Sequence, residues 1–184
     1  MKNIEHISFY DFDDTLFYTP KPDLDKNGRK ISPLTSKEYK KSTGENYPHR
    51  GWWGRKETLD MDIFNIPPNM YVKGEYLKDI KDDNRLVIMM TGRIQKLSDS
   101  VISILDSHNM KFDKYYFNTT GDTLSYKLDT LEKYVKNTKS LKSIKIYDDR
   151  DAHIPVFELW ADLMQKESNV EIEVIHIKGE KRIN

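Results

Sequence analysis

Short apolar runs recur along the chain, and three of them end directly at aspartate or threonine. The runs have the length and composition of buried strands, and apolar residues at helical spacing lie between them. They are His6–Tyr10, Leu86–Met90, Lys114–Phe117, Ile144–Tyr147 and Val170–Ile177. Alternating strands and helices predict an α/β fold with a mostly parallel sheet and helices on both of its faces.

Helical spacing is clearest in the second half of the chain. Apolar residues repeat at helical intervals in 94–105 and in 124–135, where Asp122 is placed to cap the helix. A third helix is predicted to begin near Asp151, which is either its cap or a metal ligand. Tyr71–Ile80 shows a weaker helical pattern.

The segment from about residue 17 to about residue 70 interrupts this rhythm. It holds six of the seven prolines, and Phe17–Asp60 carries ten Lys and Arg against six Asp and Glu. We interpret it as a small cap-like insertion after the first strand, within a single domain that spans residues 1–184.

Composition excludes several classes of protein. The 184 residues include no cysteine, which excludes a disulfide scaffold, a cysteine nucleophile and cysteine-bound zinc. Lysine and arginine balance aspartate and glutamate, 30 against 30, which disfavours binding of nucleic acid by the whole surface. No apolar run approaches the roughly 20 residues that span a bilayer, and the first residues lack a signal pattern. A soluble cytoplasmic protein without membrane contact is expected.

Acidic residues follow two of the predicted strands. Asp11 and Asp13 come after the first run, and Asp148 and Asp149 come after the fourth. The carboxyl ends of parallel strands meet at one edge of a sheet, so these side chains are expected to converge there. Clustered carboxylates repel one another unless a cation neutralises them, and Mg²⁺ favours such oxygen ligands.

Such a site suits phosphoryl chemistry. An ionised aspartate can attack phosphorus and form an aspartyl-phosphate intermediate. A second carboxyl group two residues later faces the same way along an extended segment, so it can protonate the leaving oxygen and then activate water.

These residues also carry a resemblance to a known superfamily. The segment Asp11-Phe12-Asp13-Asp14-Thr15-Leu16 resembles the first motif of the haloacid dehalogenase-like (HAD) phosphohydrolases. Thr91 resembles the second motif and Asp148-Asp149 the fourth, while Lys127 is the best-placed candidate for the third, with Lys114 as the fallback. The resemblance implies a Rossmann-like three-layer sandwich.

The resemblance also implies roles for these residues. Asp11 would be the nucleophile and Asp13 the general acid and base. Thr91 and Lys127 would bind the phosphoryl group. Mg²⁺ would be held by Asp11, the Asp13 backbone carbonyl, Asp148 and Asp149.

Two closer likenesses bear on the substrate. Thr91-Gly92-Arg93 together with Asp148-Asp149-Arg150 is similar to a polynucleotide 3′-phosphatase domain. A larger set of segments resembles the Swiss Army Knife RNA repair-like branch of the superfamily. These segments include DFDDTLFYTPKP, Gly51-Trp52-Trp53, FDKYYF and IYDDRDAH. These likenesses imply a phosphorylated nucleotide or the end of a nucleic acid as substrate.

Other residues have two open roles each. Arg93 and Arg150 either pair with the carboxylates or bind a second phosphate. Trp52, Trp53 and Arg55 either stack bases and hold phosphates or form a small core of the insertion. His153 either lies at the surface or contacts substrate.

The sequence therefore predicts a Mg²⁺-dependent phosphomonoesterase. Two alternatives stay open: a non-catalytic module that binds nucleic acid or protein, and a phosphotransferase with an acceptor other than water. The chain contains no GxxxxGK[ST] phosphate loop, which disfavours a kinase driven by nucleoside triphosphate. The oligomeric state does not follow from the sequence.

Overall fold

The computed structural model describes residues 3–31 and 36–183, and within them five strands form one parallel sheet. The strand order is β3-β2-β1-β4-β5, and every neighbouring pair is parallel. The strands are β1 (His6–Tyr10), β2 (Arg85–Ile94), β3 (Lys114–Asn118), β4 (Ser143–Asp148) and β5 (Glu171–His176). The predicted α/β fold is confirmed.

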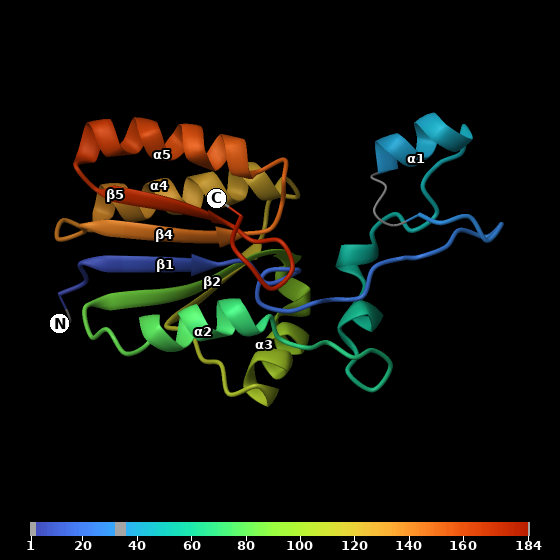
Figure 1. Cartoon of the computed structure of the whole chain (residues 1–184), viewed down its shortest axis with the longest axis horizontal. Coiled ribbons are helices and arrows are strands. Elements are labelled where there is room, and N and C mark those ends of the chain that lie inside the picture. The colour runs from blue at the N-terminus through green and yellow to red at the C-terminus, as the bar shows by residue number, and fades with distance from the viewer. Residues whose placement is uncertain (1–2, 32–35, 184) are drawn as a thin grey trace.

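Helices cover both faces of this sheet and complete the three layers (Figure 1). One face packs against α2 (Met70–Asp79) and α3 (Ser98–Ser107). The other packs against α4 (Thr123–Asn137) and α5 (Ile154–Ser168). The predicted helix in 124–135 is confirmed, and the Asp122 carboxylate caps it by accepting from the Leu124 amide at 3.1 Å.

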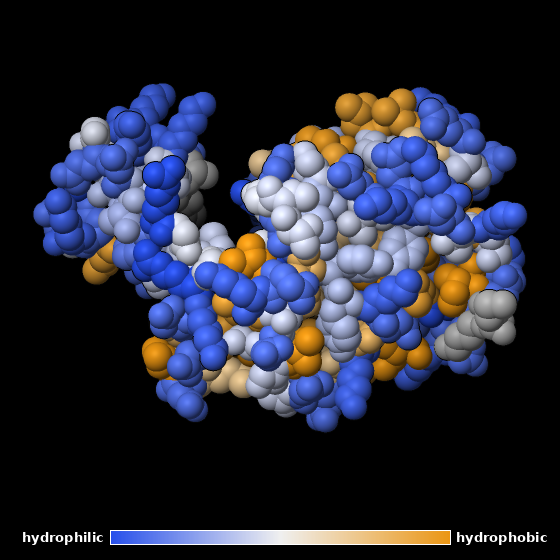
Figure 2. All heavy atoms as spheres, turned by 180° about the vertical axis from the view of Figure 1, so that it is seen from behind, coloured by the Kyte–Doolittle hydropathy of each residue, from blue (hydrophilic) through white to orange (hydrophobic). Residues whose placement is uncertain are grey.

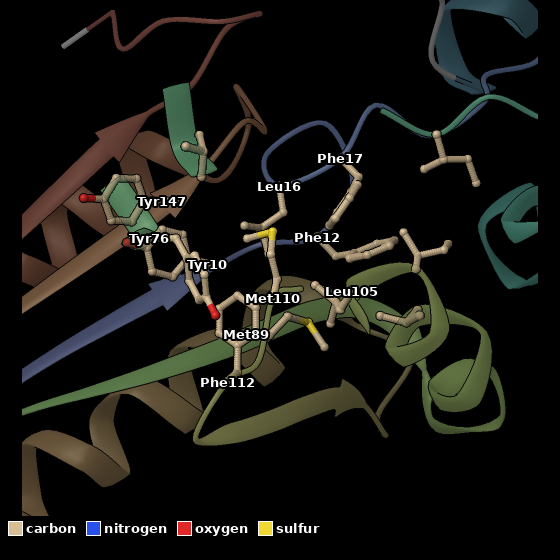
Figure 3. Packing of buried hydrophobic residues seen from close by; sticks show 14 of the residues in the cluster. Tyr10, Phe12, Leu16, Phe17, Tyr76, Met89, Leu105, Met110, Phe112 and Tyr147 are labelled. Atoms are coloured by element: carbon tan, nitrogen blue, oxygen red, sulfur yellow. The ribbon is translucent and has the colours of Figure 1, made fainter. Parts of the chain in front are cut away.

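Alternation along β1 divides the buried residues into two cores. Tyr10 belongs to the core under α2 and α3, whereas Ile7 and Phe9 belong to the core under α4 and α5. Figure 3 shows Tyr10 in the first core with Met89 and Tyr147 from the neighbouring strands. Each fully buried side chain of this size contributes roughly 1.5–3 kcal/mol, so the strands are held on both faces.

Strand β2 is longer than the sequence predicts. The expected end at Thr91 is wrong, because the strand continues through Gly92 and Arg93 to Ile94, with a shift of register against β3. Arg93 is only 1% exposed, so the inserted segment and neighbouring loops cover the polar end of the strand. Ile94 therefore lies in the strand, and α3 begins only at Ser98 after a short 3₁₀ turn.

Asp151 does not cap α5, and its carboxylate lies outside the group formed by Asp11, Asp148 and Asp149. Helix α5 begins at Ile154, with Pro155 in its first turn, and no side chain caps it. The Asp151 carboxylate instead lies 2.8 Å from Lys178 Nζ and 3.1 Å from His176 Nε2. It therefore ties the loop before α5 to the chain around β5.

The inserted segment forms a lobe beside the sheet, as Figure 1 shows, and we call residues 17–68 the inserted lobe. It contains α1 (Ser36–Thr43) and two 3₁₀ turns, Trp52–Gly54 and Lys56–Leu59. An antiparallel bridge joins Phe17 to Pro68, so the chain leaves the body and rejoins it at one place.

The inserted lobe has an internal polar scaffold. The buried carboxylate of Asp25 accepts hydrogen bonds from the Arg29 amide at 2.9 Å, from Arg29 Nε at 2.6 Å and from the Tyr39 hydroxyl at 2.6 Å. These bonds hold the turn before α1 against the helix. No helix of the described residues is long and apolar enough to cross a membrane.

A buried carboxylate on α2 also links that helix to the sheet. Asp79 accepts a hydrogen bond from the Tyr10 hydroxyl at 2.7 Å, and it lies 3.4 Å from Arg85 Nε and 3.7 Å from Lys145 Nζ. We expect Asp79→Ala to lower the free energy of unfolding by about 2 kcal/mol, because it removes the acceptor of the Tyr10 hydroxyl and the carboxylate beside Lys145, whereas Arg85 keeps Asp82 at 3.3 Å.

Tyr10→Phe provides the comparison, because it removes one donor and keeps both ion pairs. We expect it to cost only about 1 kcal/mol. Urea unfolding of both variants measures the difference, and equal losses would contradict a role for the ion pairs.

Candidate active site

A cavity of about 250 Å³ opens at the carboxyl ends of β1, β2 and β4. Asp11 and Asp13 line it from the end of β1, and Asp149 and Arg150 from the end of β4. Gly92 and Arg93 of β2, Thr123 and Lys127 of α4, and Trp53 of the inserted lobe form other parts of its wall. The sheet thus brings together residues that are far apart in the sequence, as the strand ends predict.

Lys127 lies at the centre of the acidic cluster. Its side chain is 2% exposed, and its Nζ lies 2.9 Å from Asp11 Oδ1 and 2.6 Å from Asp148 Oδ2. Burial alone would lower the pKa of this lysine, but the two carboxylates raise it, so the ammonium stays charged. The fallback candidate, Lys114, instead lies over the ring of Tyr134, 5.2 Å from its centre.

Three carboxylates meet at this point. Oxygens of Asp11, Asp148 and Asp149 all lie within 4.8 Å of one another. Burial raises the pKa of Asp11 to about 7, with Lys127 opposing the rise and Asp148 adding to it. Burial and the charges of Asp11 and Asp148 raise the pKa of Asp149 to about 8. Ionising all three groups together is therefore unfavourable at neutral pH.

The donor set fits a divalent cation. When the three carboxyl groups are ionised, Lys127 offsets one negative charge and leaves two, which is the charge that Mg²⁺ compensates. Carboxylate oxygens are also its preferred protein ligands. Asp13 is outside this triad of carboxylates, so any contribution from it to a metal would come through another atom, such as its backbone carbonyl.

The Asp13 carboxylate is bound by an arginine and lies outside the group of Asp11, Asp148 and Asp149. Arg93 donates to both carboxylate oxygens, from Nη2 to Oδ1 at 2.7 Å and from Nε to Oδ2 at 3.0 Å. The Thr19 hydroxyl donates to the same Oδ1 at 2.6 Å. Of the two roles open to Arg93, the structure shows the pairing with a carboxylate.

The same arginine reaches the inserted lobe. Its Nη1 donates to the Trp53 carbonyl and to the Thr58 hydroxyl, both at 2.8 Å. Its guanidinium carbon lies 5.2 Å from the centre of the Trp53 ring. One buried side chain therefore connects Asp13 to the lobe that forms part of the cavity wall.

Thr91 lies behind the cavity wall. It is fully buried, and its hydroxyl accepts a hydrogen bond from the Arg93 amide at 3.0 Å. Its neighbour Gly92 lines the cavity, and a Cβ at Gly92 would lie 2.8 Å from Cγ2 of Thr123. The strand and α4 therefore approach closely only because residue 92 is glycine. Phosphate binding by Thr91 stays a prediction.

The two tryptophans have different positions. Trp53 is 43% exposed and lines the cavity. Trp52 packs inside the lobe, where its Nε1 donates to the Pro20 carbonyl at 2.7 Å. Arg55 lies over the Trp52 ring and donates to the Arg50 carbonyl at 3.1 Å. Trp52 is half-buried against the lobe, and neither Trp52 nor Arg55 lines the cavity.

The cavity wall also contains Thr123, which was not predicted from the sequence, and His153, for which the sequence allows two roles. Thr123 precedes Lys127 by one helical turn, so the spacing places both on one face of α4, which could have identified it. His153 is buried, and its Nδ1 lies 4.0 Å from Asp148 Oδ1. Burial lowers the pKa of His153 to about 4, so it lines the cavity as a neutral ring.

Two comparisons with known proteins give a match. A family model described as HAD domain family 1 in Swiss Army Knife RNA repair proteins matches residues 41–183. The match begins after β1, so Asp11 and Asp13 precede it. A curated relative, the uncharacterized protein YMR265C of Saccharomyces cerevisiae, is 25% identical over 175 residues, which cover 84% of this chain and 36% of the relative. The chain thus spans about a third of the relative's length.

The raised pKa values of Asp11 and Asp149 predict how pH and Mg²⁺ affect stability. Without divalent cations, folded protein keeps protons on these groups that the unfolded chain loses near pH 4. Their contribution to the free energy of unfolding therefore falls as pH rises from about 4 to about 8. Mg²⁺ offsets this loss, so it should raise the melting temperature more at pH 8 than at pH 5.

Calorimetry of Asp149→Asn provides the test. The variant should show a flatter pH dependence in EDTA and a smaller Mg²⁺ effect at pH 8. Asp162→Asn, which removes an exposed carboxylate of α5, is the matched control and should behave as wild type. A Mg²⁺ effect that is equal at both pH values would contradict the prediction.

Proposed function

Because the chain belongs to HAD domain family 1 of Swiss Army Knife RNA repair proteins, we propose that it is a Mg²⁺-dependent phosphomonoesterase. The reaction passes through an aspartyl-phosphate on Asp11. The observation that carries this proposal is the position of Asp11, which lies against Lys127 in a cavity that Asp13 and Asp149 also line. A nucleophile, a proton carrier and cations thus share one small space.

In the first step, a carboxylate oxygen of Asp11 attacks phosphorus. The bond from phosphorus to the ester oxygen breaks, and Asp13 gives its proton to that leaving oxygen. Lys127, which contacts Asp11, offsets negative charge on the phosphoryl oxygens. Mg²⁺ bound by Asp11, Asp148 and Asp149 would supply further charge neutralisation when present.

In the second step, Asp13 takes a proton from water. The water oxygen attacks the phosphorus of the aspartyl-phosphate, inorganic phosphate leaves and the Asp11 carboxylate is restored. The bidentate bond from Arg93 fixes the orientation of the Asp13 carboxyl group, which takes the proton from water in this step. Arg93 thus positions Asp13 for the hydrolytic half of the reaction.

The proposed substrate is a phosphate monoester of a nucleotide or of a nucleic-acid end, with a terminal 3′-phosphate as the preferred form. Membership of an RNA repair family supports this class of substrate. So does the cavity wall, where Trp53 offers a ring for stacking and exposed Arg150 offers a cation for a second phosphate. Phosphoryl transfer to an acceptor other than water and a purely binding role are the competing outcomes.

Asp11→Asn tests the nucleophile. Phosphate release from 3′- and 5′-phosphorylated oligonucleotides and from the matching mononucleotides should require Mg²⁺ and stop with EDTA. The variant should lose more than about 1000-fold in kcat, because no other group replaces an attacking carboxylate.

Asp151→Asn is the matched control, since its carboxylate lies in the loop after β4 but pairs with Lys178. It should keep wild-type activity. Retained oligonucleotide binding with no phosphate release by the wild type would instead assign the chain to the binding alternative.

Asp13→Asn tests the acid. An activated aryl phosphate has a leaving group that needs no proton, whereas a nucleotide ester does. We expect the variant to lose about 100-fold or more in kcat on nucleotide esters and about tenfold or less on the aryl phosphate. Asp162→Asn, which removes an exposed carboxylate of α5 outside the cavity, should retain both activities. Equal losses on the two substrates would show that Asp13 does not protonate the leaving group.

A further inference from the structure

A second hollow lies on the inserted lobe, apart from the catalytic cavity. It has a volume of about 330 Å³ and is lined by Ser36, Lys37, Lys40, Asn46, Tyr47 and Arg50. We call it the lobe groove. It contains three cationic side chains and no carboxylate, so its lining favours an anionic ligand.

The positive charges of the three groove side chains are not neutralised by carboxylates of the described residues. Within residues 3–31 and 36–183, Lys37, Lys40 and Arg50 make no ion pair with a carboxylate. Arg29, on the same lobe, is different, because it lies 2.6 Å from both Asp25 and Glu45. The groove thus retains positive charge while a neighbouring arginine is neutralised.

Contacts within the lobe hold the Tyr47 ring of the groove in place. Tyr47 packs edge-on against Tyr39 at 5.8 Å and against His49 at 6.0 Å, and Tyr39 bonds to buried Asp25. A partly exposed aromatic ring beside several cations is the combination by which proteins hold single-stranded nucleic acid. The ring and the charges are therefore presented together.

Charge is divided between the lobe and the body. Phe17–Asp60 has four more cationic than acidic residues, and because the whole chain is neutral, the remainder has four more acidic ones. Figure 2 shows the lobe as a mostly hydrophilic projection, separated from the body by a notch. A polyanion is thus attracted more strongly to the lobe than to the body as a whole.

The groove is close to the catalytic cavity along the chain. Arg50 lines the groove, and Trp53 lines the cavity. Three residues span at most about 11 Å even when extended, and here they turn through Gly51 into a 3₁₀ helix. A strand with its end in the cavity would therefore reach the groove within a few nucleotides.

We propose that the lobe groove binds the sugar-phosphate backbone of a single-stranded nucleic acid whose terminal phosphate occupies the catalytic cavity. The proposal deepens the proposed function and rests on it. The groove therefore favours binding of a polynucleotide end over binding of a mononucleotide, because only the polynucleotide is long enough to reach it.

The test replaces the three cations together, as Lys37→Gln/Lys40→Gln/Arg50→Gln. The control, Lys81→Gln/Lys139→Gln/Lys166→Gln, removes the same charge from exposed positions of the body. Fluorescence anisotropy with a 3′-hydroxyl oligothymidylate measures binding without any scissile phosphate. Phosphate release from the 3′-phosphorylated oligomer and from thymidine 3′-monophosphate measures turnover. Thermal unfolding verifies that both variants fold.

We expect the groove variant to bind the oligomer at least tenfold more weakly, and the salt dependence of log K to lose about 2 from its slope. The kcat/KM for the oligomer should fall in parallel, while that for the mononucleotide stays within twofold. The control should resemble wild type.

Three results would overturn the proposal: equal losses in the control, an equal loss on the mononucleotide, or competition by oligoglutamate as effective as by oligothymidylate. The last would assign the groove to an acidic protein. If the wild type releases no phosphate from any substrate, the proposed function fails, and anisotropy still decides whether the groove binds nucleic acid.

Discussion

The ion pairs of Lys127 determine how the acidic end of the sheet is organised. A buried ammonium is costly unless carboxylates surround it, and buried carboxylates are costly unless a cation lies among them. Lys127 meets both requirements, because it contacts Asp11, which directly follows β1, and Asp148, the last residue of β4. Each partner thus makes burial of the other tolerable, and α4 is held over the ends of two adjacent strands. The remaining negative charge makes the cluster suitable for a divalent cation.

The framework of this site follows from the sequence because it depends on local patterns. Short apolar runs predicted the strands, and the parallel arrangement places their final residues at one edge. That is why the approach of Asp11 to Asp148 and Asp149 could be predicted. The position of Lys127 was predicted from the family resemblance and not from helical periodicity. The leucine pattern of 124–135 indicated a buried apolar face, but the structure leaves Leu124 and Leu128 half-buried and buries Lys127 and Thr130.

Other features depend on tertiary contacts that no local pattern contains. The pairing of Arg93 with Asp13 joins two strand ends 80 positions apart, and the bonds to Trp53 and Thr58 need the final position of the lobe. The end of β2 was predicted too early for the same reason, because contacts with distant residues, rather than apolar composition, bury Arg93. Asp151 was misassigned because its partners, His176 and Lys178, belong to the last strand and the chain after it.

The bridge between Phe17 and Pro68 has a consequence for how this protein can diverge. Because the lobe leaves and rejoins the body at one point, insertions and deletions within it need not disturb the sheet, and its length and shape can change over evolution. Arg93 limits that freedom, since it bonds to the lobe at Trp53 and Thr58 and to Asp13 in the body. Homologues that remodel the lobe must therefore either retain acceptors for this guanidinium or replace the arginine at the same time.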